Sequence, residues 1–176
     1  MALFVTIDDF VGEIAIPRDK YTEANLQGYL DKYEKNLLIE LLGAELYKAF
    51  IKDYTEANPD ANKFTEDRYI AIFNEIILDE SDCVLIRSEG IPKMLQYMIY
   101  FYFTRDLNFK MTIGGSVNNL QADAKESLFD ATNMITIYNE GVKTWNWIQY
   151  YLDCYNPENY DYKNFNGRVR NFNSAI

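Results

Sequence analysis

The most apolar stretch of the chain runs from Ile91 to Phe109, and its apolar side chains surround a helix on all sides. A surface helix has one apolar stripe, whereas a helix that is apolar all round is buried all round. Lys93, Gln96 and Arg105 keep every uninterrupted apolar run well below the ~20 residues that a membrane span needs. The pattern therefore predicts a buried central helix that begins near Pro92, because proline suits a first helical turn.

The first 21 residues show a different pattern. Leu3, Val5 and Ile7 recur with a period of two, and a second apolar group ends at Pro17. Such alternation favours one or two short strands or an extended arm. No partner strand is evident nearby, so this N-terminal arm, residues 1–21, could pair elsewhere, including with another subunit.

Two helical segments follow the arm. We expect Thr22 to cap the first of them, with Glu23 well placed in its first turn. Gly43 ends or kinks this helix, and the Asn58-Pro59-Asp60 cluster stops the second. The apolar positions of the two segments step by three or four and are Leu26, Leu30, Tyr33, Leu37 and Leu41, then Leu46, Tyr47, Phe50, Ile51 and Tyr54.

A third helix is predicted to begin at Thr65 and to carry apolar residues as far as Ile77. The acidic residues from Asp79 to Asp82 then interrupt the pattern. Segment 83–90 fits either a short strand or a tight helical link, and the sequence alone does not decide between them.

The segment between the central helix and the next one, residues 110–119, contains two adjacent glycines. Gly114 and Gly115 lie between Thr112-Ile113 and Ser116-Val117, and two glycines flanked by β-formers are typical of a two-residue hairpin turn. The alternative is an irregular loop between two helices.

The last predicted helix is the longest. Its apolar positions step by threes and fours from Leu120 to Leu152, which corresponds to a helix of ~33 residues and ~50 Å. Trp145 and Trp147 are two residues apart and cannot share a helix face. One is expected in the core, and the other, Trp147, is a candidate interface anchor.

The periodicity stops after residue 154, and segment 155–176 is rich in Asn and Tyr without an apolar stripe. We expect it to be an extended C-terminal arm that gains order on a partner. The candidate anchors in it are the aromatic residues Tyr160, Tyr162 and Phe165, together with the basic residues Arg168 and Arg170.

These patterns together predict an all-α fold. It is a helical bundle with a buried central helix, one long C-terminal amphipathic helix, a candidate short hairpin, and extended arms at both ends. Residues 1–154 form a single domain and 155–176 the C-terminal arm.

The charge of the chain restricts its partners. The formal net charge is −10, so the chain is a poor general binder of nucleic acid, whose phosphates need Lys and Arg. Aromatic residues make up 16% of the chain, which suits surfaces that become interfaces, although codon bias towards Tyr gives the same excess. Cys83 and Cys154 match no metal or redox spacing and are expected to be reduced thiols. The N-terminus lacks the features of a signal peptide, so we expect the protein in a cytoplasm.

The sequence offers little catalytic chemistry. It contains no histidine, which removes Ser-His and Cys-His pairs and the usual zinc and di-iron ligand sets. Gly114-Gly115 is not followed by the Gly-Lys-Ser/Thr of a phosphate loop. Asp79, Glu80 and Asp82 are the best cation candidates, but they lack the spacing of an EF-hand, and a solvated turn is the simpler interpretation. We therefore expect no enzyme activity, no cofactor and no metal, and we expect Arg105 and Asp106 to form a structural ion pair.

Two stretches in this order resemble the head–tail connector (adaptor or ring) proteins of tailed bacteriophages. They are LIELLGAELYKAF at 38–50 and GIPKMLQYMIYFYFTRD at 90–106, followed by the loop MTIGGSVNN at 111–119 and the long last helix. The chain looks closest to connectors of crAss-like and related Bacteroides phages, over about residues 22–153. The double glycine and the Asn/Tyr-rich end depart from the family pattern.

The resemblance implies a structural virion protein that forms a ring, commonly of twelve copies, between the portal and the tail. Its partners would be copies of itself, the portal protein and a tail or second ring protein, with DNA passing through unbound and no membrane involved. The protein would be assembled in the host cytoplasm and would lie in the neck of the virion. Gly114, Gly115, Trp147 and the C-terminal arm residues would then be interface positions. The alternative function is a cytosolic helical adaptor or regulator that never enters a virion.

Overall fold

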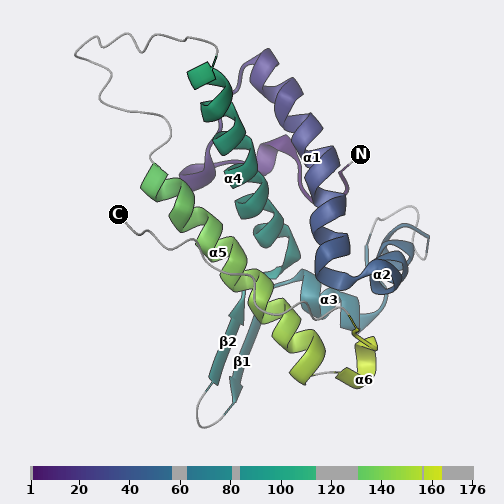
Figure 1. The fold of residues 1–176 in the computed structure, drawn as a ribbon. Helices are drawn as coiled ribbons and strands as arrows, with labels where there is room; N and C mark the ends of the chain where they lie inside the picture. The colour runs from purple at the N-terminus through teal and green to yellow at the C-terminus, as the bar shows by residue number, and fades with distance from the viewer. Residues whose placement is uncertain (1, 57–62, 81–83, 114–130, 156, 164–176) are drawn as a thin grey trace.

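The computed structural model describes residues 2–56, 63–80, 84–113, 131–155 and 157–163. It is mainly helical, with one small antiparallel hairpin (Figure 1). The helices are α1 Lys20–Leu42, α2 Ala44–Glu56, α3 Asp67–Phe73, α4 Gly90–Ile113, α5 Ala131–Tyr150 and α6 Pro157–Tyr160, and the strands are β1 Ile76–Glu80 and β2 Val84–Ser88. The predicted all-α bundle is confirmed. In the described residues no helix is long and apolar enough to cross a bilayer.

Helix α4 is the buried central helix that the sequence predicts. It lies between α1 and α5 in Figure 1 and also contacts α3 and the N-terminal arm. Its buried residues point in every direction around the axis, as expected for a helix covered on all sides. They are Ile91, Met94, Leu95, Tyr97, Met98, Ile99, Tyr100, Phe101, Phe103 and Thr104.

Helix α5 packs closely against α4 over much of its length. At the crossing, a Cβ atom added to Gly141 would lie 3.1 Å from Tyr97 Cβ and 3.2 Å from Met98 Cγ, so the absence of a side chain there lets the two helices approach. The predicted long last helix is confirmed from Ala131 onward, and it closes with a π-helical turn at Tyr151–Tyr155. Its predicted first part, residues 120–130, lies outside the described residues.

The start of α1 differs from the prediction. Asp19, and not Thr22, caps the helix: the Thr22 N–H donates to Asp19 Oδ1 at 3.0 Å, and the Thr22 hydroxyl donates to Asp19 Oδ2 at 2.6 Å. Thr22 already lies within the helix, so its role is to complete the cap. The predicted break at Gly43 is confirmed, because this residue separates α1 from α2 with a φ of 79°.

The third predicted helix is shorter than the sequence indicated. It ends at Phe73, and Ile76 and Ile77 belong to strand β1 instead. Of segment 83–90, residues 84–88 form strand β2, which pairs with β1 in an antiparallel register from Ile76↔Ser88 to Glu80↔Val84, and Gly90 begins α4. The prediction erred because two apolar residues at helical spacing are also two β-branched residues, which favour a strand where a partner strand is available.

The prediction of a hairpin around Gly114 and Gly115 is wrong for the residues that precede the two glycines. Helix α4 continues through Ile113, so Thr112 and Ile113 are helical. Both glycines lie outside the described residues.

The N-terminal arm is extended, but residues 2–19 contain no strand. They form two 3-10 turns, Ile7–Asp9 and Gly12–Ile14, and they pack on their own chain. Val5, Phe10, Ile14 and Ile16 are all buried. The period of two in the sequence therefore does not reflect a strand. It belongs to an irregular segment whose buried apolar residues are unevenly spaced.

Gly90 is the residue whose substitution should damage the fold most specifically. Its φ is 84°, and an added Cβ would lie 2.3 Å from the carbonyl oxygen of Phe73. We expect Gly90→Ala to lower the free energy of unfolding by about 2 kcal/mol or more, because the strain and the clash with backbone add. Urea denaturation followed by circular dichroism measures the change.

Gly28→Ala is the matched control for this substitution. Gly28 lies in the middle of α1 with nothing within 4 Å of the added Cβ, so alanine should raise the free energy of unfolding by roughly 0.5–1 kcal/mol. Equal stability of the two variants would contradict the assignment of Gly90 to a close backbone contact.

Candidate functional site

The best-defined polar arrangement in the structure is a clasp around Glu34, a buried carboxylate of α1 that is 4% exposed. The backbone N–H of Leu3 donates to Glu34 Oε1 at 2.6 Å, and those of Phe4 and Val5 donate to Oε2 at 3.1 Å each. One turn earlier on α1, Asp31 accepts the N–H of Ala2 at 2.8 Å. Three consecutive backbone donors thus find their acceptors on one side chain, and they fix the N-terminal arm to α1 without a partner strand.

The hydrogen bonds of the clasp hold Phe4 so that its ring lies in an aromatic cluster. Its ring centroid lies 4.7 Å from that of Tyr54, 5.3 Å from that of Phe73 and 5.6 Å from that of Phe50. The rings come from the arm, α2 and α3, and Phe64 lies among them at 4.5 Å from Phe50. Phe4 therefore packs the N-terminal arm against α2 and α3 at the tilted angles that aromatic pairs prefer. The two helices also meet each other directly, with Phe50 at 5.5 Å from Tyr69.

A second buried carboxylate, Asp53 of α2, accepts backbone N–H groups at the start of α3. It accepts the N–H of Thr65 at 2.9 Å, the N–H of Glu66 at 3.2 Å and the hydroxyl of Thr65. Glu66 is the residue that precedes α3, so the start of that helix is fixed to α2. The two ends of the connection between α2 and α3 are thereby brought together.

The two carboxyls respond to acid in opposite ways. Burial raises the pKa of Glu34 above its usual value, although the three backbone donors oppose this. Burial also acts on Asp53, but the hydrogen bonds from Thr65 and Glu66 outweigh it and lower the pKa of Asp53. Asp53 therefore stabilises the fold above its unfolded pKa and loses this effect as the pH falls. For Glu34 the sign is reversed: the part of its contribution that is linked to protonation is fully present below its unfolded pKa and is lost as the pH rises through its folded pKa, whereas the three N–H donors also bond to the carboxylate.

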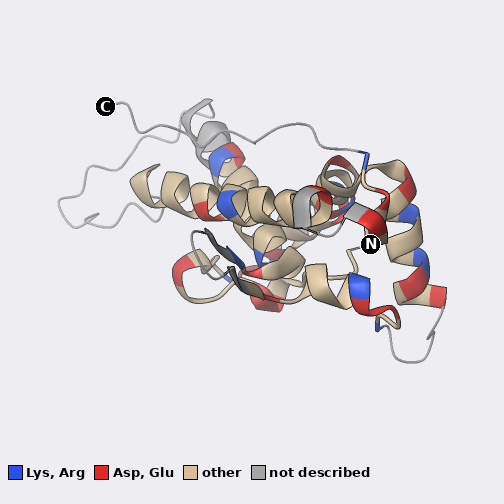
Figure 2. Cartoon of the chain, turned by 90° about the horizontal axis from the view of Figure 1, so that it is seen from below, with Lys and Arg blue, Asp and Glu red and all other residues tan. Residues whose placement is uncertain are grey.

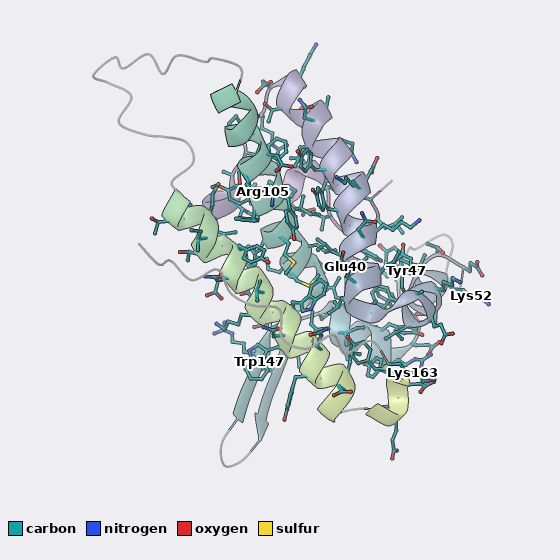
Figure 3. All side chains as sticks on the ribbon, in the orientation of Figure 1. Glu40, Tyr47, Lys52, Arg105, Trp147 and Lys163 are labelled. Atoms are coloured by element: carbon teal, nitrogen blue, oxygen red, sulfur yellow. The ribbon has the colours of Figure 1, made fainter. Side chains whose placement is uncertain are left out.

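The predicted ion pair between Arg105 and Asp106 is confirmed, at 2.8 Å between Arg105 Nη2 and Asp106 Oδ1. Asp106 also accepts the hydroxyl of Tyr29 at 2.9 Å, and burial together with this carboxylate raises the pKa of Tyr29 to about 12. The Arg105 guanidinium lies 5.2 Å from the ring centroid of Tyr102, which in turn stacks on Tyr33 at 4.6 Å. Tyr29 and Tyr33 belong to α1, whereas Tyr102, Arg105 (labelled in Figure 3) and Asp106 belong to α4, so this network joins those helices.

The C-terminal candidates Tyr160 and Tyr162 are used within the chain. Tyr160 is 4% exposed and its hydroxyl donates to the carbonyl of Arg68, in α3. The Tyr162 hydroxyl donates to the carbonyl of Leu41 at 2.6 Å, which satisfies an acceptor near the end of α1. These two tyrosines tie the first part of the C-terminal arm to the bundle, and their predicted role at an interface with another protein stays a prediction.

The two tryptophans differ in burial, as expected. Trp145 is 4% exposed in the core, whereas Trp147 is half-buried and lies on the side of α5 that faces the hairpin (Figure 3). Its ring makes an edge contact with Tyr150 at 6.0 Å. On β1, Ile77 is 61% exposed, one of the large apolar side chains that the described surface leaves in solvent. The hairpin projects from the bundle beside this end of α5 (Figure 1) and was not recognised from the sequence.

The remaining predicted site residues, Gly114, Gly115, Phe165, Arg168 and Arg170, lie outside the described residues. The same holds for the side chains of the cation candidates Asp79, Glu80 and Asp82. Among the side chains that are described, no three His, Cys, Asp or Glu residues gather as metal ligands would.

The hollows of the described surface are shallow. One of about 280 Å³ borders the aromatic cluster at Tyr54, Phe64 and Phe73. Another, of about 430 Å³, is lined by Asp53, Glu66 and Arg68 among others, and these groups already bond to one another or to the backbone. In the view of Figure 2, basic residues are interspersed with acidic ones along the helices, as expected of a surface that does not attract phosphate.

Comparison of the chain with models of protein families, with curated proteins and with solved structures gave no match.

We expect Glu34→Gln to lower the free energy of unfolding by about 2 kcal/mol. The glutamine has one carbonyl oxygen, so its amide would face at least one of the three N–H donors that the carboxylate accepts. Hydrogen exchange of the Leu3 to Val5 amides should accelerate together with this loss. The matched control is Glu56→Gln at an exposed position of α2, which should change stability by less than about 0.5 kcal/mol. Unchanged exchange in Glu34→Gln would refute the clasp.

We expect Asp53→Asn to lower the free energy of unfolding by about 1–2 kcal/mol at pH 7. Because the folded pKa of Asp53 lies below its unfolded value of 3.8, the difference from the parent protein should shrink as the pH falls below about 4. Urea denaturation at pH 7 and pH 3 measures this, with Glu56→Gln, an exposed position of α2, as the control. A difference that grows in acid would contradict the assignment.

Proposed function

We propose that this chain is a structural component of the neck of a tailed bacteriophage, where copies of it form a ring between the portal and the tail. The proposal rests first on the two stretches that resemble connector proteins. Residues 38–50 form the end of α1, the Gly43 turn and the start of α2, and residues 90–106 form most of the central helix. The stretches that carry the resemblance thus coincide with the framework of the bundle.

The observation that supports this function most is that the helical bundle has a core of its own, while the hairpin projects from it. The bundle completes its own core, and its arm and the start of its C-terminal segment are fixed by Glu34, Tyr160 and Tyr162. The hairpin, in contrast, contacts α5 through β2 and projects from the bundle with Ile77 in solvent. A rigid unit with protruding interaction elements suits repeated assembly into a ring, in which each copy contacts the next through two different surfaces.

The charge of the chain supports the same function. A net charge of −10 gives a channel wall to which phosphates do not bind, so DNA can pass along it. The twelve-fold number, the neighbouring portal and the tail-side partner are parts of the proposal that come from the resemblance.

The composition of purified particles tests the proposal. Mass spectrometry should find the chain in particles purified from infected cells, and image reconstruction should place it between the capsid vertex and the tail. Loss of its gene should yield DNA-filled heads without tails. A chain that is abundant in the infected cell but absent from particles would refute the proposal and favour the alternative, a cytosolic adaptor.

A further inference from the structure

Two tyrosines from different helices stack on each other where α1 meets α4. The ring centroids of Tyr33, in α1, and Tyr102, in α4, lie 4.6 Å apart, and the ring planes are inclined by only 11°. Aromatic pairs in proteins have centroids about 4.5–7 Å apart, so this pair is near the closest approach. Because the rings are also nearly parallel, carbon atoms of one ring face those of the other.

Other tyrosine pairs of the described residues are less closely matched. Tyr29 stacks on Tyr33 within α1, but at 5.5 Å and with an inclination of 24°. Tyr151 and Tyr160 meet edge to face, at 6.1 Å and 66°. The close and parallel arrangement of Tyr33 and Tyr102 is therefore a feature of the contact between two helices that are distant in sequence.

The surroundings of the two rings suit the loss of an electron together with a proton. Both tyrosines are half-buried, so solvent can accept a proton from each phenol. Lys32 Nζ lies 4.7 Å from the ring centroid of Tyr33, and the guanidinium carbon of Arg105 lies 5.2 Å from that of Tyr102. A positive charge beside a ring disfavours a cationic radical on it. A ring that gives up an electron here is therefore favoured to release its phenol proton as well.

We propose that Tyr33 and Tyr102 form a dityrosine cross-link when the chain meets a one-electron oxidant, so that α1 becomes covalently joined to the central helix. The proposal goes beyond the proposed function and does not depend on it, because the reaction is a property of the single folded chain.

The reaction needs two equivalents of the oxidant. Each phenol gives one electron to the oxidant and one proton to water, which leaves a neutral phenoxyl radical. The two radicals combine through ring carbons adjacent to the carbon that bears the oxygen, and one carbon–carbon bond forms. The hydrogen on each of these carbons then moves to the phenol oxygen, which restores both aromatic rings. In total, two electrons and two protons leave, so the chain becomes lighter by two hydrogen atoms.

Photo-oxidation of the purified full chain tests the proposal. At low protein concentration, tris(bipyridine)ruthenium(II) is illuminated with persulfate, which generates a diffusible one-electron oxidant and takes up the electrons as sulfate is formed. We expect a monomer that is lighter by two hydrogen atoms, has the blue fluorescence of dityrosine, and gives proteolytic peptides joined through Tyr33 and Tyr102. Its midpoint of thermal unfolding should rise by about 10 °C, because the cross-link closes a long loop in the unfolded chain.

Conservative variants separate this pair from the other tyrosines. Tyr33→Phe and Tyr102→Phe keep the stacked rings but lack the phenol oxygen, so each should abolish the joined peptides. Tyr29→Phe, in the same stack, should keep them. So should Tyr47→Phe, which changes a half-buried tyrosine of α2 that is labelled in Figure 3.

Oxidation of the unfolded chain provides a second control. In urea at a concentration that unfolds the protein, the two tyrosines are no longer held together, so the peptides joined through Tyr33 and Tyr102 should disappear. Joined peptides that persist in Tyr33→Phe or Tyr102→Phe, or that are as abundant in urea, would overturn the proposal. A main product that links Tyr29 to Tyr33, or that links two separate chains, would overturn it as well.

Discussion

The burial of α4 on every side determines the positions of the other elements. Residues such as Leu95, Met98 and Ile99 are fully or almost fully buried, and each side chain of this kind contributes roughly 1.5–3 kcal/mol when it leaves water. A helix that is apolar all round has no face that it can leave in solvent, so α1, α5 and the N-terminal arm must cover it together. Gly141 lets α5 come close, and Gly90 lets the chain turn into α4 directly against the backbone of Phe73.

Segments that lack an apolar stripe are held by a different means. The N-terminal arm, the start of α3 and the start of the C-terminal arm have few regular backbone partners, so their polar groups are satisfied by side chains. Glu34 and Asp53 accept backbone N–H groups, and the hydroxyls of Tyr160 and Tyr162 donate to carbonyl groups. Each of these bonds connects parts of the chain that are distant in sequence, and each places an aromatic or apolar neighbour, such as Phe4, into the core. The excess of tyrosine thus serves the interior of the fold as well as its surface.

The sequence predicted those parts of the fold in which periodicity alone decides the structure. The buried central helix, the break at Gly43 and the deeper burial of Trp145 relative to Trp147 follow from the pattern along a helix. The hairpin was missed because Ile76 and Ile77 continue the helical spacing of α3, and only the pairing with β2 shows that they form a strand. Nothing in the sequence distinguishes Glu34 from its exposed neighbours on α1. Its role depends on the N-terminal arm folding back onto α1 at Glu34, which is a contact between segments distant in sequence.

The completeness of the body has a consequence for assembly. Because the chain buries its core and satisfies the clasp around Glu34 by itself, association in the proposed ring would not have to supply folding energy. A single contact between copies could then be weak. Closure of the proposed ring would compensate for weak head-to-tail contacts, because the last copy makes two contacts while losing its translational freedom once. In the proposed assembly, such contacts would leave free copies apart and would become stable only when the ring is complete or when a circular partner arranges the copies side by side.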